Sequence, residues 1–113
     1  MAKEKKPQQV YTLVVQVGRG PDDGLPKGAS GAGLVCYASG VDEAEAVRET
    51  VALLKTAGMA PLDVNGYGTL EERIAQGHEI GAEERELMDR ALAENAVVVA
   101  EVTPFFGDAS GDE

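Results

Sequence analysis

Residues 10–17 read Val-Tyr-Thr-Leu-Val-Val-Gln-Val, and this stretch decides the class of the fold. β-Branched and aromatic residues, which favour strands, make up most of it. The odd-numbered residues Tyr11, Leu13, Val15 and Val17 are all apolar, whereas the even-numbered positions include a threonine and a glutamine. Because side chains alternate between the two sides of a strand, the pattern predicts a strand with one well-buried face.

A glycine-rich loop follows and leads into a second strand. Residues 18–33 contain six glycines, two prolines and the pair Asp22-Asp23. These residue types interrupt regular structure, and glycine supplies the positive φ angles that tight turns require. The apolar run at residues 34–38 then predicts a second strand, paired with the first as a hairpin.

Two longer stretches predict helices. Residues 39–42 have the spacing of a capping box, and beyond them Val47, Val51 and Leu54 fall at positions i, i+4 and i+7. This pattern predicts a helix over about residues 42–57 with those side chains in the core. A second helix is predicted over residues 83–95, where glutamates fill the first turn and an apolar stripe follows.

Three shorter elements complete the chain. Residues 61–65 predict a weak edge strand. Residues 69–76 begin with a second capping-box spacing, so we prefer a short helix there, although residues 67–74 could also be extended. Residues 96–100 form a nearly continuous apolar run, which predicts a strand in the middle of a sheet, and residues 101–103 return to alternation before Pro104 ends the strand.

The order strand-strand-helix-strand-short helix-helix-strand predicts an α+β domain. We expect a four-stranded mixed sheet whose right-handed crossovers place both long helices on one face. The result would be a two-layer α/β sandwich, ferredoxin-like in general shape. The other sheet face would leave Val10 and Val14 exposed, which indicates a homodimer or larger assembly through that face.

Length and composition indicate a single folded domain. The chain has 113 residues, of which 43% are hydrophobic. Residues 1–9 are charged and lack apolar periodicity, so they predict a flexible arm, and residues 107–113 predict a disordered acidic tail. Residues 10–106 are the expected domain.

The chain lacks a run of apolar residues that could cross a bilayer, and we therefore expect no membrane partner. Cys36 is the only cysteine and stands among apolar neighbours, which excludes an internal disulfide and predicts a buried thiol. A reducing, cytoplasmic location fits this cysteine usage best.

Charge is distributed unevenly. Residues 1–41 carry five basic and three acidic side chains, a balance of +2, whereas residues 42–113 carry five basic and seventeen acidic ones, a balance of −12. The sum of −10 repels phosphate backbones, so we expect no nucleic-acid binding and consider a basic protein partner more natural. A weaker alternative is that the acidic half mimics DNA.

The loop over residues 18–33 could bind an anion, because its glycine amides lie near Arg19 and Lys27 in sequence. It fails the requirements of a phosphate loop, in which Gly-Lys-Ser/Thr leads from a strand into a helix, since Lys27 precedes Gly28 and the loop leads into a strand. We prefer a mobile hairpin loop and keep an anion site as the alternative.

Two single residues are further candidates for ligand binding. Tyr67 stands between two glycines after a predicted strand, and His78, the only histidine, stands next to Glu79. We prefer a packed tyrosine in a turn and an exposed histidine in a linker. A solitary histidine gives no metal-ligand spacing, so we predict no metal and no cofactor.

The sequence leaves the biochemical function open. We expect a non-catalytic domain that self-associates or binds a protein partner, and we assign no catalytic residue. The alternative is an anion-binding domain or enzyme that uses the 18–33 loop with Arg19, Lys27, Tyr67 or His78.

Overall fold

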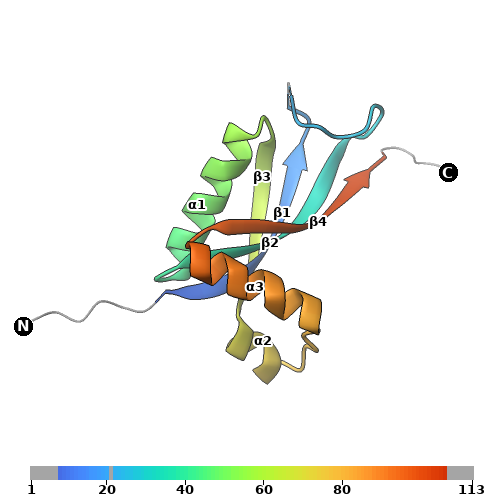
Figure 1. Ribbon diagram of the computed structural model, residues 1–113. Coiled ribbons are helices and arrows are strands. Elements are labelled where there is room, and N and C mark those ends of the chain that lie inside the picture. Colours follow the sequence, from blue (N-terminus) through green and yellow to red (C-terminus); the bar gives the residue numbers. More distant parts are fainter. Residues whose placement is uncertain (1–7, 21, 107–113) are drawn as a thin grey trace, which may run out of the picture.

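The computed structural model describes residues 8–20 and 22–106, and in them it shows a four-stranded antiparallel sheet with three helices (Figure 1). This confirms the α+β class. The expected arm over residues 1–9 lies outside the described residues except for Gln8 and Gln9, of which Gln9 already belongs to a strand, and the expected tail over residues 107–113 lies outside them entirely. In chain order the elements are β1 Gln9–Gly18, β2 Gly31–Gly40, α1 Glu43–Thr56, β3 Ala60–Thr69, α2 Leu70–Ala75, α3 Ala82–Glu94 and β4 Val97–Phe105.

The sheet has the strand order β3-β1-β2-β4, and its three pairings are all antiparallel. β1 and β2 lie in the centre, because they form a hairpin whose register runs from Gln9 opposite Gly40 to Val17 opposite Ala32. The expected mixed sheet is therefore wrong, and the strand order is not that of a ferredoxin-like fold.

The two long helices lie on opposite faces of the sheet, which corrects the expected two-layer sandwich. On one face, Leu13 and Val15 pack with Leu54 of α1 in a buried cluster. On the other face, Val10 packs with Met88 of α3. Val10, which we expected to be exposed, is buried as a result.

Strand directions explain the error. The rule of right-handed crossovers applies to connections between parallel strands. β2 and β3 run in the same direction, because both are antiparallel to β1, so the rule can apply to the connection between them through α1. β4 runs antiparallel to β2 and hence antiparallel to β3 as well. The connection from β3 to β4 through α2 and α3 is thus free to cross the other face.

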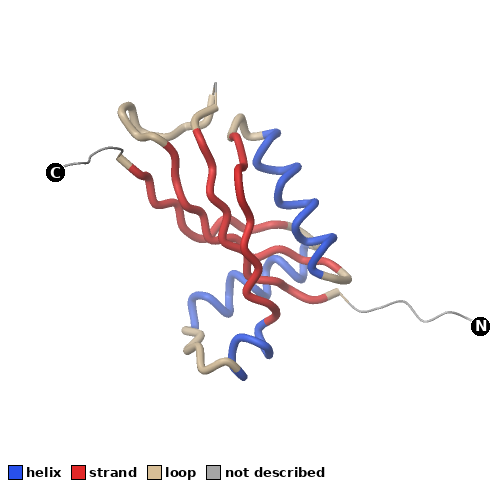
Figure 2. The backbone as a smooth tube through the Cα atoms, turned by 180° about the vertical axis from the view of Figure 1, so that it is seen from behind, coloured by secondary structure: helices blue, strands red, loops and turns tan. Residues whose placement is uncertain are grey.

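The views from the two sides show where the helices leave the sheet uncovered (Figures 1 and 2). α1 runs alongside the strands, whereas α3 crosses near one end of the sheet, next to α2. The loop between β1 and β2 projects from the opposite end of the sheet (Figure 1). Each face is therefore only partly covered by its helix.

α1 buries Leu54 as expected, but its other two buried residues lie one position before the expected Val47 and Val51. Asp42 caps the helix by accepting a hydrogen bond from the Glu45 amide, while Ser39 belongs to β2. The buried residues are Ala46, Thr50 and Leu54. Thr50 can be buried because its hydroxyl donates to the Ala46 carbonyl at 2.8 Å, while Val47 and Val51 are half-buried.

Candidate functional site

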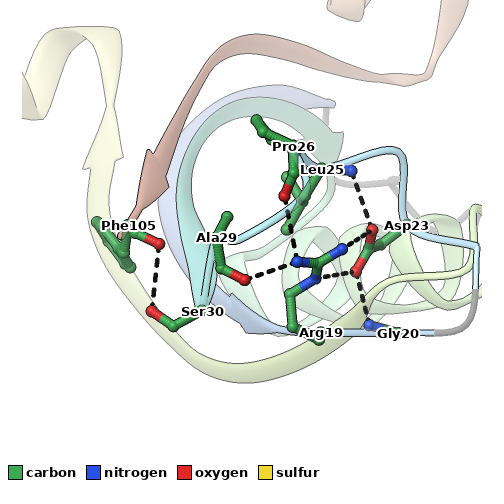
Figure 3. Close-up of polar contacts among 8 residues, drawn as sticks. All are labelled: Arg19, Gly20, Asp23, Leu25, Pro26, Ala29, Ser30 and Phe105. Atoms are coloured by element: carbon green, nitrogen blue, oxygen red, sulfur yellow. Dashed lines mark hydrogen bonds and ion pairs between the residues drawn. The ribbon is translucent and has the colours of Figure 1, made fainter. Parts of the chain in front are cut away.

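The loop between β1 and β2 is built around Arg19 (Figure 3). Its Nε donates to Asp23 Oδ2 at 2.8 Å, and its Nη1 donates to the carbonyls of Ala29 at 2.6 Å and Pro26 at 3.2 Å. Nη2 donates to the second Asp23 oxygen. The guanidinium therefore ties together three separate points of the same loop.

Asp23 completes this network from inside the loop. Its carboxylate accepts hydrogen bonds from the amides of Gly20 at 2.7 Å and Leu25 at 2.9 Å. The Arg19 side chain and these two amides hold the pKa of the Asp23 carboxyl well below its usual range. Gly20 is required here, because a Cβ at this position would collide with the carbonyl oxygen of Gly58 after α1.

The network does not join Arg19 and Lys27 around a common space. Arg19 directs its donors at the carboxylate and carbonyls of its own loop, and Lys27 is exposed. An arginine engaged in this way has little left to offer an external anion. The anion-binding role of Arg19 and Lys27 stays a prediction.

A second polar network, which the sequence analysis missed, surrounds Arg73 of α2. Its Nε donates to His78 Nδ1 at 3.0 Å, and its Nη1 donates to Thr12 Oγ1 of β1 at 3.2 Å. Nη1 also lies 3.6 Å from Glu84 Oε1 of α3. The Arg73 side chain is only 13% exposed, so this network joins α2 and α3 to the sheet in a partly desolvated environment.

His78 has a defined role in this network and is half-buried. Its Nδ1 accepts the hydrogen bond from Arg73 Nε, which orients the imidazole ring. Nearby Tyr37 is buried, and burial followed by the Glu84 charge raises the pKa of its hydroxyl, with Arg73 opposing the shift. Sequence alone could not place Arg73, since its partner Thr12 is 61 residues away.

Tyr67 lies in β3 and not in a turn, and its side chain is exposed. It lines a shallow hollow together with Glu43 and Glu72. The four candidates therefore occupy three different places, because Arg19 and Lys27 belong to the loop and His78 contacts Arg73. The hollow beside Tyr67 is lined by neither Arg73 nor His78.

The residues that the structure describes contain no group of three or more His, Cys, Asp or Glu side chains placed to hold a metal ion. Cys36 is fully buried, and burial raises the pKa of its thiol to about 11. A thiol in such an environment is an unreactive core residue. No helix among these residues is long and apolar enough to cross a membrane.

Exposed apolar side chains gather on the α3 side of the sheet, beyond the end that α3 covers. Phe105 lies across Gly33, where a Cβ would meet its ring at 3.2 Å, and Leu62 lies across Gly18. Leu62 is 70% exposed and Phe105 is 41% exposed. With two half-buried valines of the same face they form what we call the open patch, which consists of Val14, Val35, Leu62 and Phe105.

A groove separates α1 from β4 on the opposite side of the sheet. One wall is a stripe of α1, and the other is the beginning of β4 with the residues before it. We call it the α1–β4 groove. Its lining residues are Ser39, Glu45, Glu49, Ala52, Leu53, Thr56, Asn95, Ala96 and Val97.

The fold thus defines an α+β domain with a central antiparallel hairpin and two partly covered sheet faces. The chain belongs to a family that is described as a domain of unknown function, DUF8846, and the match covers residues 10–106. Comparison with curated proteins and with solved structures finds no match. The family description names no activity, so function must be argued from the surfaces above.

Proposed function

We propose that this chain is a non-catalytic protein-binding domain that self-associates through the open patch. The observation that carries the proposal is the exposure of Leu62 and Phe105 on the sheet surface that α3 leaves uncovered. Exposed apolar side chains grouped on one surface are a recognised sign of an interface. A two-fold contact would bury the patch of each copy against that of the other.

The polar networks support a structural rather than a catalytic use of the charged residues. Arg19 binds the carboxylate and carbonyls of its own loop, and Arg73 binds residues of the sheet and of α3. Both arginines therefore stabilise the fold from within. On the sheet surface that α3 leaves uncovered, the exposed apolar side chains of the open patch lie beside the exposed polar residues Gln16, Asp63 and Glu101.

Electrostatic repulsion opposes self-association. Each chain carries a net charge of −10, and Asp63 and Glu101 are exposed on the strands that carry the patch. Added salt screens this repulsion, while it leaves apolar contacts intact. The proposal therefore requires association to strengthen from low to moderate salt.

Light scattering at concentrations well above micromolar tests the proposal. We expect twice the mass of one chain at moderate salt and a lower average mass at low salt. Phe105→Ala and Leu62→Ala should each shift the wild-type equilibrium towards the monomer, because both side chains are large, apolar and exposed.

Ile74→Ala is the control, since Ile74 is an exposed apolar residue on α2, away from the patch. It should leave the mass unchanged. A monomeric mass for the wild type at both salt concentrations would contradict self-association. A dimer that survives both patch substitutions would place the interface elsewhere.

A further inference from the structure

The α1–β4 groove lies where a second helix would pack in a complete helical layer. α1 contributes its buried stripe, Ala46, Thr50 and Leu54, to the sheet, and its neighbouring stripe faces the groove. In β4, Val99 pairs with Cys36 and Val102 pairs with Leu34, so both valines share the face that α1 covers. The surface beside α1 is therefore an uncovered continuation of the main core.

Apolar side chains are exposed in the groove and beyond its end. Leu53 of α1 lines the groove and is 41% exposed. Further along β4, outside the groove lining but on the same face of the sheet, Val99 and Val102 are 37% and 47% exposed. Helices pack on sheet and helix surfaces with interaxial distances of about 8–10 Å, and an added helix that lies in the groove and extends along β4 would bury all three side chains.

Charged residues of α1 lie on both of its flanks. Glu45 and Glu49 line the groove, one helical turn apart. Arg48 and Glu43 line a different hollow, on the β3 flank. Glu45 also accepts a hydrogen bond from the Val41 amide at 2.8 Å, which fixes its carboxylate at the groove end. The lining of the groove includes two acidic residues and no basic one.

We propose that the α1–β4 groove binds a basic amphipathic helix of another protein. The apolar face of that helix would cover Leu53, Val99 and Val102, and lysines or arginines along its edge would face Glu45 and Glu49. This surface is distinct from the open patch, which lies on the other side of the sheet.

Charge and strand geometry decide between occupants. A second copy that docked groove to groove would bring its own Glu45 and Glu49 against the same residues of the first. This contact is unfavourable, because the carboxylates carry like charges and repel each other. An added strand would have to follow β4 past the register shift opposite Val35 and Cys36 and past Pro104, two features that interrupt regular pairing. A basic helix meets neither obstacle.

A synthetic peptide of about 18 residues, long enough to form a helix, serves as the probe. It carries leucines at helical spacing i, i+3, i+4 and i+7 with lysines on both edges. One control peptide has the same composition in scrambled order, and another has glutamates in place of the lysines. Binding to the isotopically labelled chain is followed by the shifts of its amide resonances.

We expect the basic amphipathic peptide to shift amides of α1 and β4 and to bind more weakly as salt increases. Leu53→Ser should weaken binding about tenfold. Glu49→Gln should weaken it about two- to fivefold, as expected for one exposed ion pair. Arg48→Gln, on the other flank of α1, is the matched control and should not weaken it.

Each alternative outcome overturns the proposal. Equal binding of the scrambled or the acidic peptide, unchanged affinity in Leu53→Ser, or shifts confined to other elements would each do so. A mass increase without peptide that Leu53→Ser abolishes would assign the groove to a second copy instead. The same peptide is titrated into the Phe105→Ala variant, so that binding at the groove is measured whether or not the chain self-associates through the open patch.

Discussion

The two faces of the sheet are attached to their helices by different means. On the α1 face, the buried cluster joins ten residues of β1, β2 and α1, including Leu13, Leu34 and Leu54. On the α3 face, the buried cluster has four residues, and the Arg73 network provides a polar attachment in addition. The α1 face therefore carries most of the stability, and the α3 face depends on a few specific contacts.

The difference also bears on function. Apolar packing on the α1 face is extensive but stops at the flank of α1, which leaves the α1–β4 groove. α3 crosses only one end of its face and leaves the open patch. Each helix covers only part of its face of the sheet, and each of the two proposed interfaces lies on surface that a helix leaves uncovered.

The largest expected effect is a loss of core packing on the α1 face. Leu54 is 1% exposed and belongs to the main cluster, so Leu54→Ala should reduce the free energy of unfolding by about 2–5 kcal/mol. Lys55→Ala changes an exposed neighbour and should change the free energy by less than about 0.5 kcal/mol. Urea unfolding measures both, and equal effects would contradict the phase of α1.

A smaller and more local effect is expected from the Arg73 network. Arg73→Met keeps the aliphatic part of the side chain but leaves the buried Thr12 hydroxyl without its donor, which should cost about 1–3 kcal/mol. Hydrogen exchange should accelerate in α2 and α3 before it does in α1. Arg90→Met, at an exposed ion pair of α3, is the control and should have no such effect.

If exchange in α1 and α3 accelerated equally in Arg73→Met, the two faces would not be independently attached. The comparison between them would then be wrong, even if the total loss of stability agreed with the expected range.

The smallest effect is expected in the loop. The pKa of Asp23 is lower in the folded chain than in the unfolded chain, so the ionised carboxylate stabilises the fold at neutral pH. This stabilisation is lost as the pH falls below about 4, the ordinary value for aspartate. Asp23→Asn should therefore lower the melting temperature at pH 7, and the difference from the wild type should shrink in acid.

Asp22→Asn serves as the control for this pH dependence, since Asp22 is exposed. Thermal melts of both variants across the acidic range provide the comparison. A difference between Asp23→Asn and the wild type that is constant with pH would show that the Asp23 charge does not stabilise the loop.

The sequence predicted the order and type of the elements because each carries a local signal. The capping box at Thr69 and Glu72, for example, is present in the structure and explains why residues 70–75 are a helix. Strand lengths were underestimated, since Gly31 and Gly33 belong to β2 and the glycines around Tyr67 belong to β3. Glycine was taken as a sign of a loop, although pairing with a neighbouring strand holds it extended.

The long-range arrangement could not be predicted in the same way. Which face α3 covers depends on the direction of β4, and this direction is set by pairing with β2. The Arg73 network likewise depends on contacts between distant elements. The sequence offered Arg19 as a candidate anion ligand, but its partner Asp23 became evident only from the path of the loop.

Amide resonances of the labelled wild-type chain, recorded over a range of concentrations at moderate salt, test the central claim most directly. The claim is that uncovered sheet surface is the binding surface of this domain. We predict that dilution shifts the amides around Leu62 and Phe105, at the open patch, while the amides of α1, on the other face of the sheet, stay unchanged. Spectra that are independent of concentration, or shifts that lie away from the patch, would contradict the account.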